Sequence, residues 1–325
     1  MENDIFNVKV HHFEQKALAV FRYQAAHIAV YQQYLRALKI KPENVKSLEG
    51  IPFMPIQFFK EHIIYPKKFQ KPALQFESSG TGGKSSRHFI AKALLYDQSL
   101  LQSFEQHMGS VEDYHFLALL PSYLERKNAS LVYMFKKLME FSKQKSEDFF
   151  LNDFSGFSKR LEEVDRHSDK KIFIIGVSFA LLSLAEKYPN SIPPDSILME
   201  TGGMKGRRKE MVRAELHEVL KGAFGLDHIY AEYGMTELLS QAYYLKDQKF
   251  HCPPWMRVKV REAEDPFSYC AAGKTGALNV IDLANLYSCS FIATDDVGRD
   301  LGNGNFDVLG RLDESDIRGC NLMFA

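Results

Sequence analysis

The amino-acid sequence predicts an α/β fold with a largely parallel sheet, followed by a small β-rich part. Short apolar segments that end at Gly, Pro or a turn alternate with helical patterns through the middle of the chain, an order typical of parallel sheets covered by helices. After Pro254 the pattern changes, because residues 257–261 alternate polar and apolar side chains, as in a strand with one wet face. Glycines then separate further short segments.

The elements follow in chain order. Residues 10–38 predict one long helix, because apolar side chains recur at spacings of three, four or seven, and Pro42 closes it. Residues 207–224 carry another helical pattern. In parallel sheets ligands gather at the carboxyl ends of strands, and two glycine-bearing segments, 202–203 and 233–234, follow predicted strands directly. The predicted strands are residues 115–120, 171–175, 196–199 and 228–232.

Composition sets the broad class. The chain has 325 residues, 45% hydrophobic and 25% charged, which predicts a soluble protein with a large buried core. Its 41 basic and 41 acidic residues balance, so there is no electrostatic reason to expect nucleic acid as a partner. We expect no signal peptide and no membrane span. The four cysteines form no CxxC pair, which favours free thiols in a reducing cytoplasm.

A polar loop between Phe76 and Phe89 is the first candidate site. Glycines let backbone N–H groups turn towards a phosphate, hydroxyls add donors and a lysine adds charge. The P-loop pattern requires Gly five residues before its Gly-Lys pair, but Ser stands at that position here, so that motif is excluded. A flexible surface loop stays open as the alternative. The candidate phosphate-binding residues are Ser78, Ser79, Gly80, Thr81, Gly82, Gly83 and Lys84.

A second candidate site follows the last predicted strand of the middle region, in the segment Tyr-Gly-Met-Thr-Glu at residues 233–237. A carboxylate beside a hydroxyl at a strand end suits a Mg²⁺ ion that is shared with triphosphate oxygens, so Thr236 and Glu237 are candidates. Tyr233 offers a flat face for a base. The alternative is an ordinary strand-to-helix turn with Thr236 as its N-cap.

Three segments, in this order and at these intervals, resemble the series of motifs found in adenylate-forming enzymes, which join a carboxylic acid to AMP. The segments are residues 78–84, 233–237 and 310–320. The phosphate loop departs from the family pattern at Gly82, where a second Thr is usual. Ser85-Ser86 also replaces the Pro-Lys that commonly follows, which weakens any lysine anchor beyond Lys84.

The resemblance implies roles for the nucleotide site. Tyr233 is expected to pack on adenine, and Gly202 and Gly203 to line the same pocket, although a helix-entry turn is the alternative for these glycines. Thr236 is expected to contact the α-phosphate. Glu237 is expected to support Mg²⁺, so that ATP and Mg²⁺ are the implied cofactors.

The resemblance also implies a ribose ligand. The family's ribose-binding carboxylate aligns with Asp296, and Asp295 qualifies as its neighbour, since an acceptor-only carboxylate suits a vicinal diol. A solvated turn before Gly298 is the alternative for either residue. Arg311, in the segment that resembles the family's hinge motif, is expected to reach the nucleotide.

Over nearly the whole chain the sequence is similar to one branch of these enzymes, the acyl-protein synthetases of bacterial luminescence systems (LuxE type). The similar segments are residues 21–25, 51–60, 200–206, 233–237, 251–255 and 318–320. Family members activate a fatty acid as acyl-AMP and then move the acyl group to a cysteine near their own C-terminus. A partner acyl reductase takes it onward to the aldehyde.

The similarity to this branch implies that the chain is divided into three parts. Residues 1–250 are expected to form an α/β adenylate-forming core with an N-terminal helix, and residues 251–310 a β-rich subdomain of the same domain. Residues 311–325 are expected to form a short arm that carries Cys320. The C-terminal lid of other adenylate-forming enzymes, with its lysine and its coenzyme A surface, is expected to be absent.

Cys320 is the predicted acyl acceptor. Arg318 stands two residues away, and nearby positive charge lowers a thiol pKa. A thiolate attacks an acyl-adenylate readily, because the mixed anhydride has an excellent leaving group. An incidental cysteine is the alternative. Cys252, beside His251, is the rival thiol and ranks lower, since neighbours in sequence rarely face each other.

Two other functions stay open. One is an acid–coenzyme A ligase similar to phenylacetate–coenzyme A ligase, which shares the phosphate loop without the Pro-Lys. The other is a non-catalytic nucleotide- or acyl-binding module. The sequence predicts neither the acyl chain length nor the final acceptor, the pathway or the oligomeric state.

Overall fold

The computed structural model describes residues 2–78, 84–121, 128–202, 208 and 211–312, and the chain divides into two compact units. The first unit comprises Met1–Ser99, Met235–Ser240 and His251–Ala325. The second unit comprises Leu100–Gly234 and Gln241–Phe250. The chain therefore passes from the second unit to the first between Gly234 and Met235, inside one of the predicted site segments.

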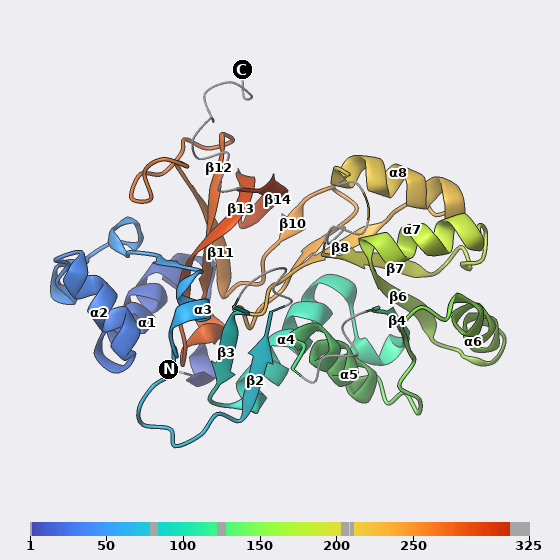
Figure 1. The fold of residues 1–325 in the computed structure, drawn as a ribbon, viewed down its shortest axis with the longest axis horizontal. Coiled ribbons are helices and arrows are strands. Elements are labelled where there is room, and N and C mark those ends of the chain that lie inside the picture. Colours follow the sequence, from blue (N-terminus) through green and yellow to red (C-terminus); the bar gives the residue numbers. More distant parts are fainter. Residues whose placement is uncertain (1, 79–83, 122–127, 203–207, 209–210, 313–325) are drawn as a thin grey trace. The chain divides into compact units, whose positions relative to one another are not determined.

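The second unit is built on a mostly parallel sheet flanked by helices (Figure 1). Its strand order is β9-β8-β7-β6-β4-β5, in which β9 runs antiparallel to β8 and the other neighbours pair in parallel. The predicted parallel sheet is thereby confirmed. The strands are β4 (Tyr114–Leu119), β5 (Phe149–Phe150), β6 (Lys171–Val177), β7 (Ile197–Thr201), β8 (Tyr230–Tyr233) and β9 (Ala242–Tyr244). The helices are α5 (Ser130–Phe141), α6 (Phe154–His167), α7 (Ser178–Lys187) and α8 (Arg213–Phe224).

Two of these strands end at the predicted glycine segments. Strand β7 ends at Thr201 and is followed by Gly202, and β8 ends at Tyr233 and is followed by Gly234. The two strands are neighbours, with Thr201 paired to Glu232. Their carboxyl ends therefore meet at one edge of the sheet, where ligands of α/β proteins usually bind.

The helix predicted at 207–224 begins later than expected, at Arg213. Val212 has an extended backbone, with φ −68° and ψ 148°, so its position is the N-cap rather than a helical turn. Gly225 ends the helix in the left-handed conformation, with φ 66°, which glycine adopts without a steric penalty.

The first unit contains an antiparallel sheet in the order β11-β12-β13-β14, to which β1 adds a short parallel pairing with β13. The alternating segment at 257–261 is indeed a strand. Strands β2 and β3 form a separate hairpin. The strands are β1 (Met54–Pro55), β2 (Leu74–Glu77), β3 (Arg87–Ile90), β11 (Met256–Arg261), β12 (Thr275–Asp282), β13 (Phe291–Gly302) and β14 (Asn305–Arg311). The helices are α1 (Phe13–His27), α2 (Ala29–Ala37) and α3 (Phe58–Glu61).

Two elements lie where the chain changes unit. Helix α4 (Ala93–Met108) begins in the first unit and ends in the second, and β10 is Phe250–His251. Short 3-10 helices complete the described elements: η1 (Glu2–Asp4), η2 (Val10–His12), η3 (Pro42–Asn44), η4 (Leu48–Gly50), η5 (Val111–Asp113) and η6 (Leu283–Asn285).

The single helix predicted at 10–38 is wrong, because the chain breaks at Ile28 into α1 and α2. Ile28 is extended, with φ −102° and ψ 103°. The break lets Phe21 and Tyr31 meet edge to face with ring centroids 6.0 Å apart, whereas residues ten apart in one helix are separated by about 15 Å along its axis. The spacing of apolar residues continues through the break, so periodicity alone does not reveal it.

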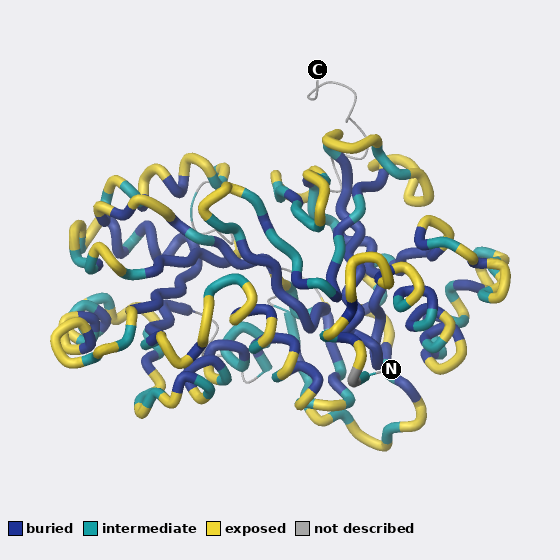
Figure 2. Tube along the Cα trace, turned by 180° about the vertical axis from the view of Figure 1, so that it is seen from behind, coloured by how far each residue is buried: buried dark blue, intermediate teal, exposed yellow. Residues whose placement is uncertain are grey.

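Burial follows this architecture. Figure 2 shows buried residues concentrated along the central strands of each unit and exposed residues along loops and outer helix faces. Strands β4, β6 and β7 are almost wholly buried, as expected for parallel strands covered on both faces. Among the residues that the structure describes, no helix is both long enough and apolar enough to cross a bilayer.

Candidate functional site

The predicted phosphate loop lies in the chain between β2 and β3, and two serines form its stem where these strands end. Beyond the last strand pair, Glu77 with Arg87, the Ser78 N–H donates to the Ser86 carbonyl at 3.0 Å. The Ser86 N–H donates to Ser78 Oγ at 2.9 Å. Ser78 and Ser86 thus pair on either side of the loop, and Lys84 is exposed. The predicted phosphate ligands Ser79, Gly80, Thr81, Gly82 and Gly83 lie outside the described residues.

Glu237 lies against this stem. Its side chain is buried, with the residue 4% exposed, and it is hydrogen-bonded to Ser86. Burial raises the pKa of the Glu237 carboxyl, the Ser86 bond and the charge of Arg311 lower it, and the charge of Asp296 raises it. The structure therefore brings together four predicted site elements in the first unit: the loop stem, Glu237, Asp296 and Arg311.

Thr236 does not cap a helix, so the alternative of an ordinary strand-to-helix turn is wrong. No helix follows in the described chain before β9. The reason is Asp282, whose carboxylate accepts the backbone N–H groups of Leu239 at 2.8 Å and Ser240 at 3.0 Å. It also accepts the Ser240 hydroxyl at 2.6 Å. A side chain distant in sequence thus takes the donors that a helix would use, and Thr236 stays half-buried in an irregular segment.

The two neighbouring aspartates have different surroundings. Asp295 Oδ1 accepts from Gln57 Nε2 at 2.8 Å, and Asp295 Oδ2 lies 3.9 Å from the Arg311 guanidinium. Asp296 Oδ1 lies 3.4 Å from Arg311 Nε. Of the two, Asp296 is the one whose charge raises the pKa of Glu237. Asp296 is therefore the one that shares an electrostatic environment with the proposed magnesium ligand.

The second unit holds the other predicted nucleotide residues. Tyr233 is 8% exposed and meets Phe250 edge to face at 5.8 Å. Gly202 has φ +55°, a left-handed backbone that favours glycine, and Gly203 lies outside the described residues. At Gly234 an added Cβ would stand 2.3 Å from a Glu232 carboxylate oxygen, so a larger residue there would displace that side chain.

Two buried carboxyls that the sequence does not predict as a pair, Glu200 and Glu232, lie near the ends of β7 and β8. Glu200 accepts the Ser178 hydroxyl at 3.0 Å. Burial raises its pKa, but His217, Arg213 and Ser178 together bring it below the ordinary value. Burial instead raises the pKa of Glu232 to about 7, helped by the charge of Glu200 and opposed by the Thr201 hydroxyl. Near neutral pH this strand edge therefore carries one ionised and one partly protonated carboxyl.

His88 and Asn285, which no sequence pattern singles out, are both fully buried. One nitrogen of His88 lies 2.8 Å from the Thr236 carbonyl and the other 3.0 Å from Asn285 Oδ1. Asn285 Nδ2 donates to the Glu237 carbonyl at 2.7 Å. His88 stands at a buried position of β3, whose residues alternate in burial. A histidine in such a strand is a signal for a buried ring, but it does not say what the ring contacts.

The burial of His88 predicts a pH-dependent stability. Burial lowers its pKa from the ordinary 6.5 to about 4, against hydrogen bonds to Thr236 and Asn285 that raise it. As the pH falls below 6.5 the unfolded chain binds a proton that the folded chain refuses until about pH 4. We expect this residue to cost up to about 3 kcal/mol of unfolding free energy across that window, and nothing above it.

Urea unfolding at several pH values between 7 and 4 measures this effect. The His88→Asn variant should be less stable at pH 7 but should lose less stability on acidification than the unsubstituted protein. Parallel pH profiles of the two proteins would show that His88 is not held neutral by burial.

A magnesium ion fits this donor set. The described residues contain no cluster of three or more His, Cys, Asp or Glu able to hold a metal ion. Mg²⁺ in nucleotide enzymes is commonly held by one or two carboxylates together with phosphate oxygens, so one buried carboxylate at the stem of the predicted phosphate loop would suffice. A cation there would favour the ionised form of Glu237, which burial alone disfavours.

None of the three described cysteines is activated. Burial raises the pKa of the Cys252 thiol well above its ordinary value, and the charges of Asp282 and Asp300 raise it further. Burial likewise raises the pKa of Cys289 to about 12 and that of Cys270 above normal. Low thiolate content disfavours the rival Cys252 as a nucleophile. Cys320 lies outside the described residues.

Comparison with known proteins gives a family and a fold. A family model described as acyl-protein synthetase, LuxE, matches residues 6–325. No curated protein matches the chain. Among solved structures, 2-hydroxyisobutyryl-CoA ligase in complex with 2-HIB-AMP and CoA has a TM-score of 0.66 at 14% identity, over 96% of this chain and 71% of that chain.

Two further solved structures match a smaller part of this chain. ATP-bound MatB from Rhodopseudomonas palustris has a TM-score of 0.54 at 14% identity, over 73% of this chain and 47% of that chain. The ATP-bound RpMatB-BxBclM chimera B1 has a TM-score of 0.56 at 15% identity, over 73% of this chain and 47% of that chain. The chain thus spans about half the length of these relatives. The predicted fold class, an α/β fold like the large N-terminal domain of adenylate-forming ligases, is confirmed.

Proposed function

Since the chain belongs to the LuxE family of acyl-protein synthetases, we propose that it activates a fatty acid as acyl-AMP, with ATP and Mg²⁺, and then transfers the acyl group to its own Cys320. A partner acyl reductase or another acceptor protein then receives the acyl group. We place this reaction in the cytoplasm, where a free thiol persists.

One observation carries the proposal most directly. Ser86, at the stem of the predicted phosphate loop, is hydrogen-bonded to the buried carboxyl of Glu237. A loop suited to phosphates and a carboxylate suited to Mg²⁺ thus lie side by side, although Ser86 and Glu237 are 151 positions apart in the sequence. This is the arrangement that a magnesium–triphosphate complex requires.

In the first step, a carboxylate oxygen of the fatty acid attacks the α-phosphorus of ATP. The bond from that phosphorus to the oxygen bridging to the β-phosphate breaks, so acyl-AMP forms and pyrophosphate leaves. We assign phosphate binding to the loop residues 78–84 and α-phosphate contact to Thr236. Glu237 would hold Mg²⁺, which would supply positive charge against the triphosphate.

The other nucleotide contacts follow the predicted roles. We propose that Tyr233 packs on adenine and that Gly202 and Gly203 line its pocket. Asp296 accepts the ribose hydroxyls. Arg311, whose guanidinium lies beside Asp296, contacts the nucleotide from β14.

In the second step, the Cys320 thiolate attacks the acyl carbonyl carbon. The bond between that carbon and the AMP oxygen breaks, a thioester forms and AMP leaves, while the thiol proton passes to solvent or a nearby base. The raised pKa values of the three described cysteines support this choice, because Cys252, Cys270 and Cys289 hold little thiolate at neutral pH.

ATP–pyrophosphate exchange across a panel of carboxylic acids, with and without Mg²⁺, tests the first step. Exchange should require Mg²⁺ and should respond to fatty acids. Absence of exchange with every acid from acetate to long chains would contradict adenylation and would favour a non-catalytic nucleotide- or acyl-binding module. Exchange accompanied by acylation of added coenzyme A, with no acyl group on the protein, would favour an acid–coenzyme A ligase.

Asp296→Ala is expected to act mainly on ATP binding. Ribose contacts are present in both the ground state and the transition state, so their loss raises the KM for ATP while kcat changes little. The Asp295→Ala variant is the matched control, because Asp295 is held by Gln57 on the neighbouring segment. Steady-state exchange kinetics at varied ATP would assign the ribose to Asp295 instead if only that variant raises the KM.

A further inference from the structure

We propose that Gln24 on α1 and Asn285 are positioning residues for Glu237, acting through a continuous set of buried hydrogen bonds. The inference rests on the proposed role of Glu237 in adenylation and extends it to a residue more than two hundred positions away in the sequence. Each of the two side chains is fully buried, and neither is in a segment expected to touch a substrate.

Gln24 fixes the segment that carries Asn285. Its Nε2 donates to the backbone carbonyls of Asn285 at 3.0 Å and Leu286 at 3.1 Å, and it lies 3.1 Å from Ser290 Oγ. Its Oε1 accepts the Ser290 N–H at 3.0 Å. One amide thus holds both ends of the turn between η6 and β13.

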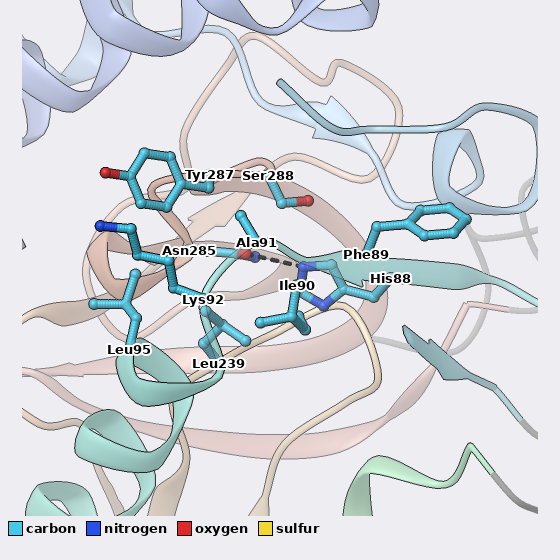
Figure 3. A pocket seen from close by; sticks show the side chains of 10 residues that line it. All are labelled: His88, Phe89, Ile90, Ala91, Lys92, Leu95, Leu239, Asn285, Tyr287 and Ser288. Carbon is cyan, nitrogen blue, oxygen red and sulfur yellow. Dashed lines mark hydrogen bonds between the residues drawn. The ribbon is translucent and has the colours of Figure 1, made fainter. Parts of the chain in front are cut away.

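Asn285, which Gln24 holds in place, contacts the backbone of Glu237. Its Nδ2 donates to the Glu237 carbonyl at 2.7 Å, and its Oδ1 faces His88 at 3.0 Å. Figure 3 shows the Asn285 and His88 side chains pointing towards each other, with apolar side chains such as Leu239 and Ile90 beside them. His88 in turn lies 2.8 Å from the Thr236 carbonyl. The backbone carbonyls of Thr236 and Glu237, two consecutive residues, are therefore held by the hydrogen-bonded side chains of His88 and Asn285.

Asp282 also holds the segment 236–240, because its carboxylate accepts the N–H groups of Leu239 and Ser240. The segment has no helix or strand of its own to fix it. Its backbone position, and hence the direction of the Glu237 carboxylate, depends on side-chain hydrogen bonds from His88 on β3, Asp282 on β12 and Asn285 on η6. A displacement of about 1 Å in a catalytic group can lower a rate about 100-fold, so these bonds are expected to matter for turnover.

Two variants test the proposal by acid-dependent exchange kinetics. Asn285→Asp keeps the volume but replaces the donor that faces the Glu237 carbonyl by an acceptor, and should lower kcat about 100-fold. Gln24→Met removes the amide but keeps the length, and should lower kcat about 10-fold. In both variants the KM for the acid should stay within about two-fold, because binding contacts are untouched.

Gln144 provides a matched control in the second unit. Its amide is similarly engaged, accepting the Phe116 N–H at 2.8 Å and donating to the Phe116 and Ser146 carbonyls at 3.0 and 2.8 Å. Gln144→Met removes the same kind of bonds and should lower stability to a similar extent. Its kcat per folded molecule should equal that of the unsubstituted protein.

Double variants with Glu237→Gln separate positioning from loss of folded protein. If Gln24 and Asn285 act through the Glu237 carboxylate, their substitutions should reduce the residual kcat of Glu237→Gln by far less than they reduce that of the parent. Equal fold-losses in both backgrounds would overturn the proposal, as would normal kcat in the single variants. Absence of exchange in the unsubstituted protein would instead remove the proposed function and this inference together.

Discussion

Replacing Glu237 by Gln is expected to lower fatty-acid-dependent pyrophosphate exchange by at least about 100-fold, comparable to deleting one preorganised electrostatic group. Gln keeps the shape of the side chain and can still accept the hydrogen bond to Ser86. It lacks the negative charge that would hold Mg²⁺. The loss should appear in kcat, and raising the Mg²⁺ concentration should recover part of it.

Exchange rates and thermal unfolding of the same preparations check this result. The unfolding temperature should stay near that of the unsubstituted protein, since a neutral side chain suits a buried site. Glu112→Gln, the same substitution at an exposed ion pair with Lys143, should leave exchange unchanged. Near-normal exchange in Glu237→Gln would remove this residue from the magnesium site.

Replacing Cys320 by Ser is expected to abolish stable acyl labelling of the protein while leaving pyrophosphate exchange largely intact. Adenylation needs only the nucleotide site, whereas the second step needs a thiolate, and a serine hydroxyl is far less ionised. Incubation with ATP, Mg²⁺ and a labelled fatty acid, followed by gel analysis, measures the label. Hydroxylamine should release the label from the unsubstituted protein, as expected for a thioester.

Cys252→Ser is the control for this prediction, because its partly covered thiol has a raised pKa. It should change neither labelling nor exchange. Loss of label in Cys252→Ser, with retention in Cys320→Ser, would reverse the assignment of the acyl acceptor.

The sequence was informative where local pattern determines structure. Short apolar runs ending at glycine or a turn predicted both ends of β4, β6, β7 and β8 to within about two residues, because a strand buried on both faces excludes polar residues. The break at Ile28 escaped prediction because the same apolar spacing continues on both sides of it. The start of α8 was placed too early because apolar spacing does not reveal the extended backbone at Val212.

The site was harder to predict where it depends on contacts distant in sequence. Ser86 looked like a departure from the family's lysine anchor, yet the structure has it closing the loop and bonding Glu237. The bonds of Gln24 to the turn at 285–290 join residues more than 260 positions apart. No periodicity or spacing rule relates such positions, so a single sequence cannot show that they meet.

The most direct test of acyl-adenylate formation followed by acyl transfer is to follow the carboxylate oxygens. A fatty acid labelled with ¹⁸O in both positions is incubated with the protein, ATP and Mg²⁺, and the released AMP is analysed by mass spectrometry. Attack of the carboxylate on the α-phosphorus, followed by thiolate attack on the acyl carbon, transfers one labelled oxygen to AMP and leaves the other in the thioester on Cys320. AMP that carries one ¹⁸O atom is the predicted result. Acylated protein together with AMP free of ¹⁸O would contradict the account, because the acid would then have been activated without an acyl-adenylate.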